Sequence, residues 1–487
     1  MLNKIKYLGI WLICLLVGIS NVKALDVTQD LTLTDDMNER IVVTKGSTVT
    51  INLNGHNITL DEANADAISN YGTLTIKGSG VVTSRGAAVI NYPGGTVTID
   101  NGEYLSNGWY TIKNMGTMTI NNMKFGNNVN NGSSLIVNGY YGNAANDRGQ
   151  TEADTVMMTI NGGTFTNKNN SCNVVKNDDY GRLVIKGGSF IANSDAEDNA
   201  NPVIQNWHIA TIYDGTFTSN HGIVLANGYL DDTADKGELT INGGTFTGSV
   251  GIFGTNGSAK QNKGVLTING GTFNGDATVS TAYKTVINGG IFDDENITPN
   301  EEEGYDVYTV IGGENDGMSV VLKEEDLTPE VSGGPVNEDD VDDEILESIE
   351  DAIKDKYTLA SYYEVEIVKL TKDGDVVGTI EETDEPVEVL LGVPSSLPAV
   401  KTGFIRKYYV IRVHNGEVTI IDDVKDNGDG TVTFKSDKFS TYALAYTDVE
   451  ENIKSPNTFD GISIYLFTIL ISFVVLAFSS IALKNNN

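Results

Sequence analysis

Basic residues are scarce in this sequence. Its 487 residues include 32 Lys and Arg against 66 Asp and Glu, which gives a formal net charge of −34. A chain this acidic repels phosphate backbones, so we expect no nucleic acid among its partners. The hydrophobic fraction of 40% is still enough for a sizeable core, and the length favours more than one folded unit.

Cysteine and histidine are also scarce. The two cysteines are Cys14 and Cys172, and Cys14 lies in an N-terminal apolar run that we expect to be removed. An intrachain disulfide is then impossible, and packing alone must hold the fold. The histidines at positions 56, 208, 221 and 414 show no metal-ligand spacing, so no metal site is predicted.

Long apolar runs are confined to the two ends of the chain. At the N-terminus, residues 1–24 have the form of a secretory signal peptide. Lys4 and Lys6 precede the apolar run, and the small residues Val22 and Ala24 predict cleavage after Ala24.

The second apolar run lies near the C-terminus. Residues 462–483 contain no charged residue and are long enough to cross a bilayer as a helix. Lys484 opens the short tail 484–487, which the positive-inside rule places in the cytoplasm. The predicted location is therefore the cell surface, with the rest of the chain outside.

The middle of the chain repeats one short unit. The unit is clearest at 239–246 and 266–273, which both read Leu-Thr-Ile-Asn-Gly-Gly-Thr-Phe. Gaps between units vary, but the step from the Ile to the next large apolar residue is always five. The pairs are Ile99 and Tyr104, Ile120 and Phe125, Ile160 and Phe165, Ile185 and Phe190, Ile212 and Phe217, Ile241 and Phe246, Ile268 and Phe273, and Ile287 and Phe292.

This pattern predicts a right-handed parallel β-helix over 25–325. Strict alternation is typical of strands, and the Gly-Gly between them is a turn that needs positive φ. Each Ile and Phe should lie over its counterpart in the next coil, about 4.8 Å away. The Asn before each Gly-Gly, at 161, 242, 269 and 288, could form an amide ladder. We expect 25–40 to cap the first coil and 300–325 to close the last.

Beyond the repeats the composition changes. Residues 326–337 are predicted to be a linker, and 338–356 an acidic amphipathic helix. Two-residue periodicity and turn signals over 357–448 predict a small β-sandwich-like domain. The predicted fold class is thus all-β, with one short helix and a C-terminal transmembrane helix.

Two sets of residues resemble known families. The repeats resemble the pectin-lyase-like β-helix superfamily, and their Asn-Gly-Gly-Thr-Phe form, as at 242–246, resembles repeats in clostridial-type Gram-positive surface proteins. Within 449–461, a second linker, the motif Ser455-Pro456-Asn457-Thr458 resembles an LPXTG-like sorting signal. That resemblance implies cleavage by a sortase after Thr458 and attachment to peptidoglycan. Phe459 replaces the usual Gly and the tail has a single Lys, so a plain membrane anchor stays open.

No catalytic residue is predicted. Enzymes of the pectin-lyase-like family need several carboxylates on neighbouring coils, with Ca²⁺ in the lyases, whereas Thr, Ser and Asn dominate the outward positions here. Asp100 and Asp214 each precede a turn glycine and are interpreted as turn carboxylates. The acidic loop that includes Asp426 and Asp429 lacks the Glu that would close a calcium-binding EF-hand loop, so no cofactor is predicted and Ca²⁺ is only a weak alternative.

The predicted binding residues are aromatic. Insertions at about 138–156, 227–237 and 254–264 all precede the Leu-Thr-Ile strand and should leave one corner of the solenoid, where repeat proteins bind ligands. The aromatic candidates are Tyr140, Tyr141, Trp207 and Tyr229. They could stack on an extracellular glycan or another cell-surface ligand, or they could pack against the coil wall.

Three functions stay open from the sequence. The first is non-catalytic adhesion or glycan binding. The second is a polysaccharide lyase or glycoside hydrolase on the same scaffold. The third is a structural role in the wall coat.

Overall fold

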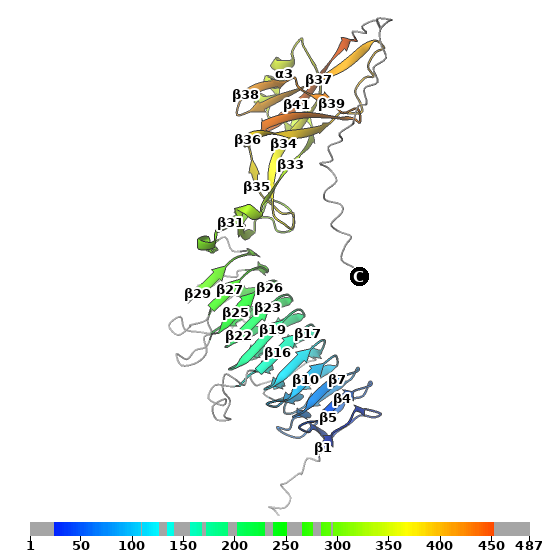
Figure 1. Ribbon diagram of the computed structural model, residues 1–487, viewed down its shortest axis with the longest axis vertical. Coiled ribbons are helices and arrows are strands. Elements are labelled where there is room, and N and C mark those ends of the chain that lie inside the picture. The colour runs from blue at the N-terminus through cyan, green and yellow to red at the C-terminus, as the bar shows by residue number, and fades with distance from the viewer. Residues whose placement is uncertain are drawn as a thin grey trace, which may run out of the picture. The chain divides into compact units, whose positions relative to one another are not determined.

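The computed structural model describes residues 24–108, 110–125, 134–140, 156–167, 172–192, 202–228, 237–250, 265–275, 284–293 and 296–451, without the side chains of 220–223, 249–250 and 284 (Figure 1). They divide into two compact units. Unit 1 runs to Ser332 and also contains Glu366–Glu381, and unit 2 contains Gly333–Val365 and the residues from Glu382 onward. The predicted signal peptide, the sorting-like motif and the segment 462–483 lie outside the described residues, apart from Ala24.

Unit 1 is a parallel β-solenoid built from three sheets, as far as the described residues show. Sheet A has nine strands: β1 (Ala24–Val27), β3 (Arg40–Val43), β6 (Ile68–Asn70), β9 (Val89–Asn91), β12 (Tyr110–Asn114), β15 (Ser134–Asn138), β18 (Asn173–Asn177), β21 (Ile204–Asn206) and β24 (Leu225–Asn227). Sheet B has eleven strands: β2 (Leu31–Thr32), β4 (Thr48–Asn52), β7 (Thr73–Lys77), β10 (Thr96–Ile99), β13 (Thr117–Ile120), β16 (Val156–Ile160), β19 (Gly181–Ile185), β22 (Ile209–Ile212), β25 (Glu238–Ile241), β27 (Val265–Ile268) and β29 (Lys284–Ile287).

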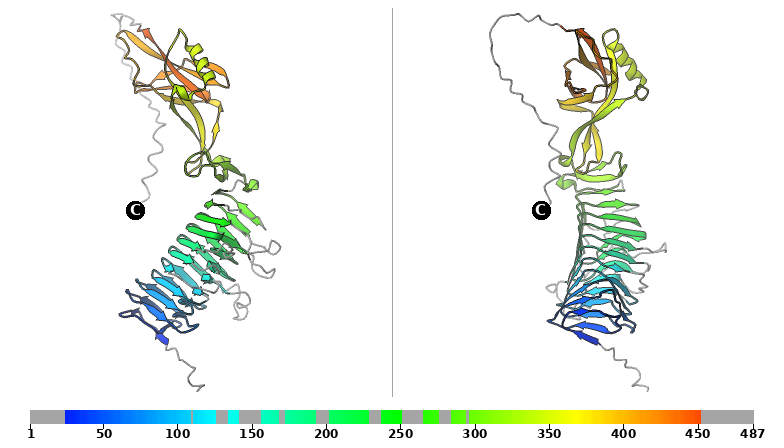
Figure 2. Two further views of the ribbon diagram at one scale, coloured as in Figure 1. Left: turned by 180° about the vertical axis from the view of Figure 1, so that it is seen from behind. Right: turned by 90° about the vertical axis from the view of Figure 1, so that its right-hand side faces the viewer.

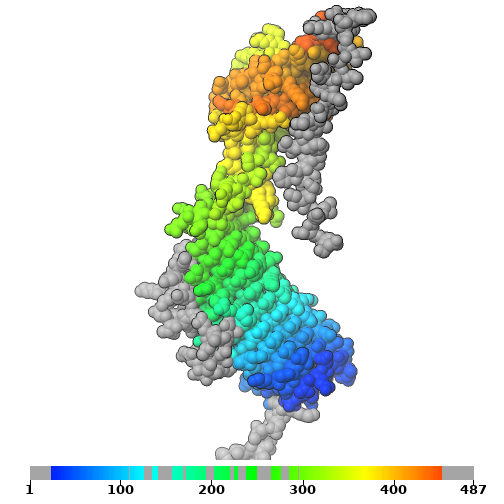
Figure 3. Space-filling model, in the orientation of Figure 1, coloured from blue at the N-terminus to red at the C-terminus, as the bar shows by residue number. Residues whose placement is uncertain are grey.

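Sheet C has twelve strands, of which the last two are antiparallel: β5 (Ile58–Leu60), β8 (Val81–Ser84), β11 (Glu103–Ser106), β14 (Lys124–Phe125), β17 (Thr164–Asn167), β20 (Ser189–Ala192), β23 (Thr216–Ile223), β26 (Thr245–Val250), β28 (Thr272–Asn274), β30 (Gly290–Phe292), β32 (Ser319–Lys323) and β31 (Tyr305–Thr309). Strands of successive coils stack one above another (Figure 2), and the coils pack without visible openings in the view of Figure 3.

The predicted columns are confirmed. The anchoring isoleucines pair in register through sheet B from Ile51 to Ile287, coil by coil. The rings of Phe165, Phe190, Phe217, Phe246, Phe273 and Phe292 form one stack, with neighbouring centroids 4.6 to 4.9 Å apart. These spacings match the distance between hydrogen-bonded strands, so one stack of side chains forms the interior.

A second column was missed by the sequence interpretation. The asparagine that ends each strand of sheet A from β6 to β24 is buried, and its Nδ2 donates to the Oδ1 of the next one at 2.7 or 2.8 Å. Its members are Asn70, Asn91, Asn114, Asn138, Asn177, Asn206 and Asn227. The sequence signal for this column is the repeated three-residue ending of these strands, which consists of an apolar residue, any residue and Asn.

Three segments close the last coils of unit 1. After the 3₁₀ turn η1 (Glu301–Glu303), β31 and β32 form an antiparallel hairpin whose β32 pairs with β30. Next comes the 3₁₀ turn η2 (Glu324–Asp326). The third segment is the hairpin that joins the end of β34 (Thr358–Leu370) to β35 (Val376–Ile380).

Unit 2 consists of antiparallel strands and one helix among its described residues. One sheet has the order β33 (Thr328–Val336), β34, β41 (Thr441–Glu450), β37 (Phe404–His414) and β38 (Glu417–Ile421). A smaller sheet has the order β36 (Glu382–Gly392), β40 (Thr431–Lys438) and β39 (Lys425–Asp426).

The helix α3 (Asp343–Ile353) is shorter than the predicted helix 338–356. The Asp342 side chain accepts a hydrogen bond from the Glu344 N–H at its start, and the 3₁₀ turn η3 (Glu338–Asp340) precedes it. Ile349 is fully buried in a cluster that includes Ile411 and Ala443, so the apolar face of α3 covers the larger sheet.

The predicted linker 326–337 does contain the boundary between the two units, but it is not an irregular segment. Most of it is β33, a strand in the larger sheet of unit 2 that begins at the end of unit 1. A Cβ added to Gly333 would overlap the Glu364 carbonyl oxygen, so the close approach of β33 to β34 requires glycine at this position. Among the described residues, none of the helices is both long and apolar enough to cross a membrane.

Candidate functional site

The candidate site lies at the corner where sheet B turns into sheet C. The residue after each anchoring Ile forms an outer column, whose members over the last six coils are Asn161, Lys186, Tyr213, Asn242, Asn269 and Asn288. The first residue of each sheet C strand forms a hydroxyl column, whose members are Thr164, Ser189, Thr216, Thr245 and Thr272. Between the columns lie two-residue turns, which are Gly-Gly in all of these coils except the one that contains Asp214 and Gly215, and we call this strip the glycine corner.

The packing and backbone conformation of the coils favour glycine at these turns. A Cβ added to Gly270 would lie 2.8 Å from the Asn242 carbonyl oxygen of the preceding coil. Gly271 has φ of +110°, where a side chain is strained. The stacking of coils therefore keeps the corner free of side chains, apart from Asp214, and leaves a strip of mostly bare backbone between two polar columns.

The predicted amide ladder is confirmed in the last coils. Asn269 Nδ2 donates to Asn242 Oδ1 at 2.9 Å, and Asn288 Nδ2 donates to Asn269 Oδ1 at 3.0 Å. Asn300 extends the ladder by donating to Asn288 Oδ1 at 2.9 Å. Asn161 instead donates to Asn121 in a separate group, at 2.8 Å. Each bond uses one of two N–H groups on a side chain, so the exposed amides retain hydrogen-bonding capacity.

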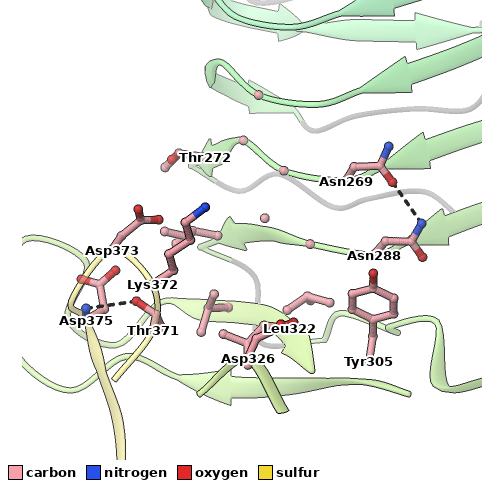
Figure 4. Close-up of a pocket in the computed structure, with 18 of the residues that line it drawn as sticks. Asn269, Thr272, Asn288, Tyr305, Leu322, Asp326, Thr371, Lys372, Asp373 and Asp375 are labelled. Carbon is pink, nitrogen blue, oxygen red and sulfur yellow. Dashed lines mark hydrogen bonds between the residues drawn. The ribbon is translucent and has the colours of Figure 1, made fainter. Parts of the chain in front are cut away.

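A pocket of about 770 Å³ occupies the C-terminal end of the glycine corner. Its walls include Asn269 and Asn288 on one side and Thr272 on the other, with the glycine turns between (Figure 4). We call it the corner pocket. Tyr305 and Leu322, which belong to the β31–β32 hairpin, line the end of this pocket. The volume is in the range of small-molecule sites.

The turn between β34 and β35 forms the remaining wall. Lys372, Asp373 and Asp375 belong to this turn and line the pocket (Figure 4). The turn is ordered by its own backbone, because the Gly374 N–H donates to the Thr371 carbonyl at 3.0 Å and the Asp375 N–H donates to Thr371 Oγ1 at 3.1 Å.

Two contacts attach the β34–β35 hairpin to the β31–β32 segment that closes the last coil of unit 1. The Ile311 N–H donates to the Val376 carbonyl at 2.8 Å, and Val377 is buried in an apolar cluster with Val310 and Val320.

An ion pair adds to these contacts. Lys369 Nζ lies 2.7 Å from Glu324 Oε1, and the Tyr308 hydroxyl donates to Glu324 Oε2 at 2.6 Å. The hydrogen bond from Lys369 lowers the pKa of Glu324 most, and the hydrogen bond from Tyr308 lowers it further. Burial, together with this hydrogen bond, raises the pKa of Tyr308 to about 12.

The pocket is acidic. One lysine, Lys372, faces four aspartates around the lining: Asp214, Asp326, Asp373 and Asp375. Asp214 Oδ1 accepts a hydrogen bond from the Gly215 N–H at 2.7 Å, which confirms its interpretation as a turn carboxylate. The arrangement favours neutral polar ligands over anionic ones.

Tyr140 and Trp207, two of the four aromatic residues expected to bind a ligand, do not line the corner pocket. Tyr140 is 1% exposed and its hydroxyl donates to the Met115 carbonyl at 3.2 Å. Trp207 is 7% exposed and lies under Lys176, whose Nζ is 3.3 Å from the ring centroid. Both rings are packed against the solenoid, which is the alternative that the sequence left open. Tyr141 and Tyr229 lie outside the described residues.

A buried charged pair next to Trp207 was not anticipated. Lys176 Nζ lies 3.5 Å from Asp178 Oδ2, and both side chains are almost fully buried. Burial lowers the pKa of Lys176 and raises that of Asp178, against the opposing effect of the ion pair. Neither residue belongs to the repeated unit, and so the repeat gave no signal for this pair.

Within the described part of the chain, no group of three or more His, Cys, Asp and Glu side chains is placed to hold a metal ion. In the acidic loop, Asp426 Oδ1 accepts from the Gly428 N–H at 2.8 Å and Asp429 Oδ1 from the Thr431 N–H at 3.0 Å. These carboxylates thus stabilise a turn.

Comparisons of the chain with protein-family models, with curated proteins and with solved structures found no match.

Proposed function

We propose that this is an exported, surface-anchored protein that binds a neutral linear glycan along the glycine corner without cleaving it. The observation that supports the proposal is the exposed amide ladder beside a parallel column of hydroxyl groups, separated by bare backbone. Amides and hydroxyls both donate and accept hydrogen bonds, as do the hydroxyl groups of a sugar.

The repeat of the corner suits a repeating ligand. Each coil adds one outer-column residue and one hydroxyl at a step of about 4.8 Å. A 1,4-linked pyranose unit is comparable in length to this step. A chain lying along the corner would therefore present a similar set of hydroxyls to each coil.

Tyr213 supplies the apolar contact that sugars need. It is 53% exposed and stands in the outer column between Lys186 and Asn242. An exposed aromatic ring in a polar strip offers its face to the C–H groups of a pyranose, which burial removes from water.

The two ends of the chain support the surface location. The signal-like residues 1–24 imply export, and 462–483 imply retention in the membrane unless a sortase joins Thr458 to peptidoglycan. In this proposal unit 1 is a right-handed β-helix of the pectin-lyase-like type, and unit 2 is a sandwich-like spacer near the wall. Mass spectrometry of wall-released peptides separates the two anchors: a peptide that ends at Thr458 with a wall fragment supports the sortase, and an intact 462–487 contradicts it.

The binding proposal is tested on an array of neutral and acidic glycans. Tyr213→Ala should weaken binding roughly tenfold or more, because the stacking face is lost, while Tyr213→Phe should retain it. Tyr71→Ala is the matched control, since Tyr71 is another exposed tyrosine, 38% exposed, on a different corner of the solenoid. Equal binding by wild type and Tyr213→Ala would reject the glycine corner as the site.

A glycoside hydrolase is the second candidate, because four aspartates line the corner pocket and such enzymes act through paired carboxylates. Release of reducing ends from a bound glycan would establish hydrolysis and reject binding without cleavage. Failure of every glycan to bind would leave the structural wall-coat role.

A further inference from the structure

The glycine corner has one end that is closed and one that continues. Toward the N-terminus the outer column continues from Asn242 to Tyr213, Lys186 and Asn161. Toward the C-terminus the parallel stacking stops at β30, because β32 pairs with it in the antiparallel sense. The strip of repeating groups therefore ends within the corner pocket.

The chemistry of the last coil differs from that of the others. The hydroxyl column ends at Thr272, and its next position is Ile291, which pairs with Val320 of the closing hairpin. Leu322 and the Tyr305 ring complete this apolar end, with the Lys323 Nζ 4.9 Å from the ring centroid of Tyr305 (Figure 4). A ligand chain that follows the polar columns meets a wall at this point.

Charged groups are concentrated at the same end. Lys372, Asp373 and Asp375 come from the β34–β35 turn, and in Figure 4 the amino group of Lys372 points toward the space beside the glycine turns. Such charged groups bond hydroxyls more strongly than neutral amides do. The end residue of a glycan has a hydroxyl that is a glycosidic oxygen in every internal residue.

We infer that the corner pocket receives the end of the glycan, so that the protein recognises a chain terminus rather than any internal stretch. This inference rests on the proposed function, since it takes the glycine corner as the glycan site. It adds a specific ligand class: neutral linear 1,4-linked glycans with an unmodified end.

Stoichiometry tests the inference on the full exported chain. The probes are cello-, xylo-, manno- and malto-oligosaccharides of six units and the corresponding long polymers, titrated by calorimetry. End recognition predicts at most one protein per glycan chain at both lengths. Several proteins per chain, increasing in number with length, would overturn end recognition while leaving the glycine corner as a binding site.

Modified ends give the second readout. Each six-unit probe is also used with its reducing end converted to the alditol, and with its non-reducing end 4-O-methylated. One of the two changes should weaken binding at least about tenfold, and which one does so identifies the recognised end. Equal affinity of all three forms would contradict the inference.

A pair of variants separates the pocket from the corner. Lys372→Ser should weaken binding of the free-ended probe and abolish the difference between free and modified ends, whereas Tyr213→Ala should weaken binding of all forms by the same factor. Lys372 is exposed, so unchanged thermal unfolding is the check that the variant folds. If Lys372→Ser keeps the full difference, the hairpin does not recognise the end. If no probe binds the wild type, both the proposed function and this inference fail.

Discussion

At the scale of single residues, the same side chain has two roles in this protein according to its burial. The asparagines of sheet A are buried and bond one another, whereas those of the glycine corner bond one another at the surface. Burial makes an unmade hydrogen bond costly, because no water replaces the lost partner. The buried ladder therefore stabilises the fold, and the exposed one is available for a ligand.

This difference gives a stability prediction. Asn138 is fully buried; it donates to Asn177 Oδ1 and to the Arg182 carbonyl, and accepts from Asn114. Asn138→Ala should lower the free energy of unfolding by about 3 kcal/mol, because buried polar groups lose their partners. Asn161→Ala, at an exposed asparagine that donates to Asn121, is the control and should change it by no more than about 0.5 kcal/mol. Urea unfolding measures both, and similar losses would contradict the distinction.

A second residue-scale prediction concerns acid. Arg406 makes two hydrogen bonds to Asp448, of 2.8 and 2.9 Å, and these hold the pKa of Asp448 below its ordinary value of 3.8. Because the folded pKa is the lower one, the stabilisation is present above the ordinary pKa and is lost as the pH falls through the folded pKa. The melting temperature of wild type should therefore drop more steeply than that of Asp448→Asn as the pH falls below about 4. Parallel curves for the two proteins would show that the pair contributes nothing.

At the scale of elements, the repeated turn is decided by the coil beneath it. In the first glycine of each pair, an added Cβ would meet the backbone oxygen of the preceding coil at 2.5 Å for Gly289, 2.8 Å for Gly270 and 3.2 Å for Gly162. None of these three glycines has a positive φ, so the contact alone decides the effect.

The three distances predict an order of damage. Gly289→Ala should destabilise most, by about 1–3 kcal/mol, and Gly270→Ala less. Gly162→Ala should be close to neutral, because the loss of freedom in the unfolded chain offsets the mild contact. The midpoints of urea unfolding should follow this order, and a reversed order would show that the corner relaxes freely.

Elements of unit 2 show where sequence patterns were insufficient. The strands β34, β36, β37 and β40 lie in the region 357–448, where the sequence shows two-residue periodicity. Alternation was sufficient for these because one face of each strand is buried. Residues 328–336 contain Pro and Gly and fall in the predicted linker, yet pairing with β34 makes them a strand. Amino-acid composition indicates the conformation that a segment prefers in isolation, but it does not indicate whether a distant strand pairs with that segment.

At the scale of the whole molecule, charge limits the ligands. The formal charge of −34 creates a repulsive field for anionic polymers, which salt screens over about 8 Å at physiological ionic strength. Binding of a neutral glycan should therefore be nearly independent of NaCl. Polygalacturonate should not bind at low salt, where repulsion is strongest. Titrations at two salt concentrations measure both, and tight binding of polygalacturonate at low salt would contradict a neutral ligand.

The solenoid follows from the sequence alone. A constant step of five from Ile to Phe or Tyr repeats in every unit from Ile99 onward, with glycine in most of the turns, and whatever repeats must stack with itself. The columns of Ile, Phe and the last corner asparagines followed from this local regularity. Only the tertiary structure decided that Tyr140 and Trp207 are packed against the solenoid and that the β34–β35 turn closes the corner pocket. Those outcomes depend on single contacts between distant segments, such as Ile311 with Val376, and a contact made once leaves no period in the sequence.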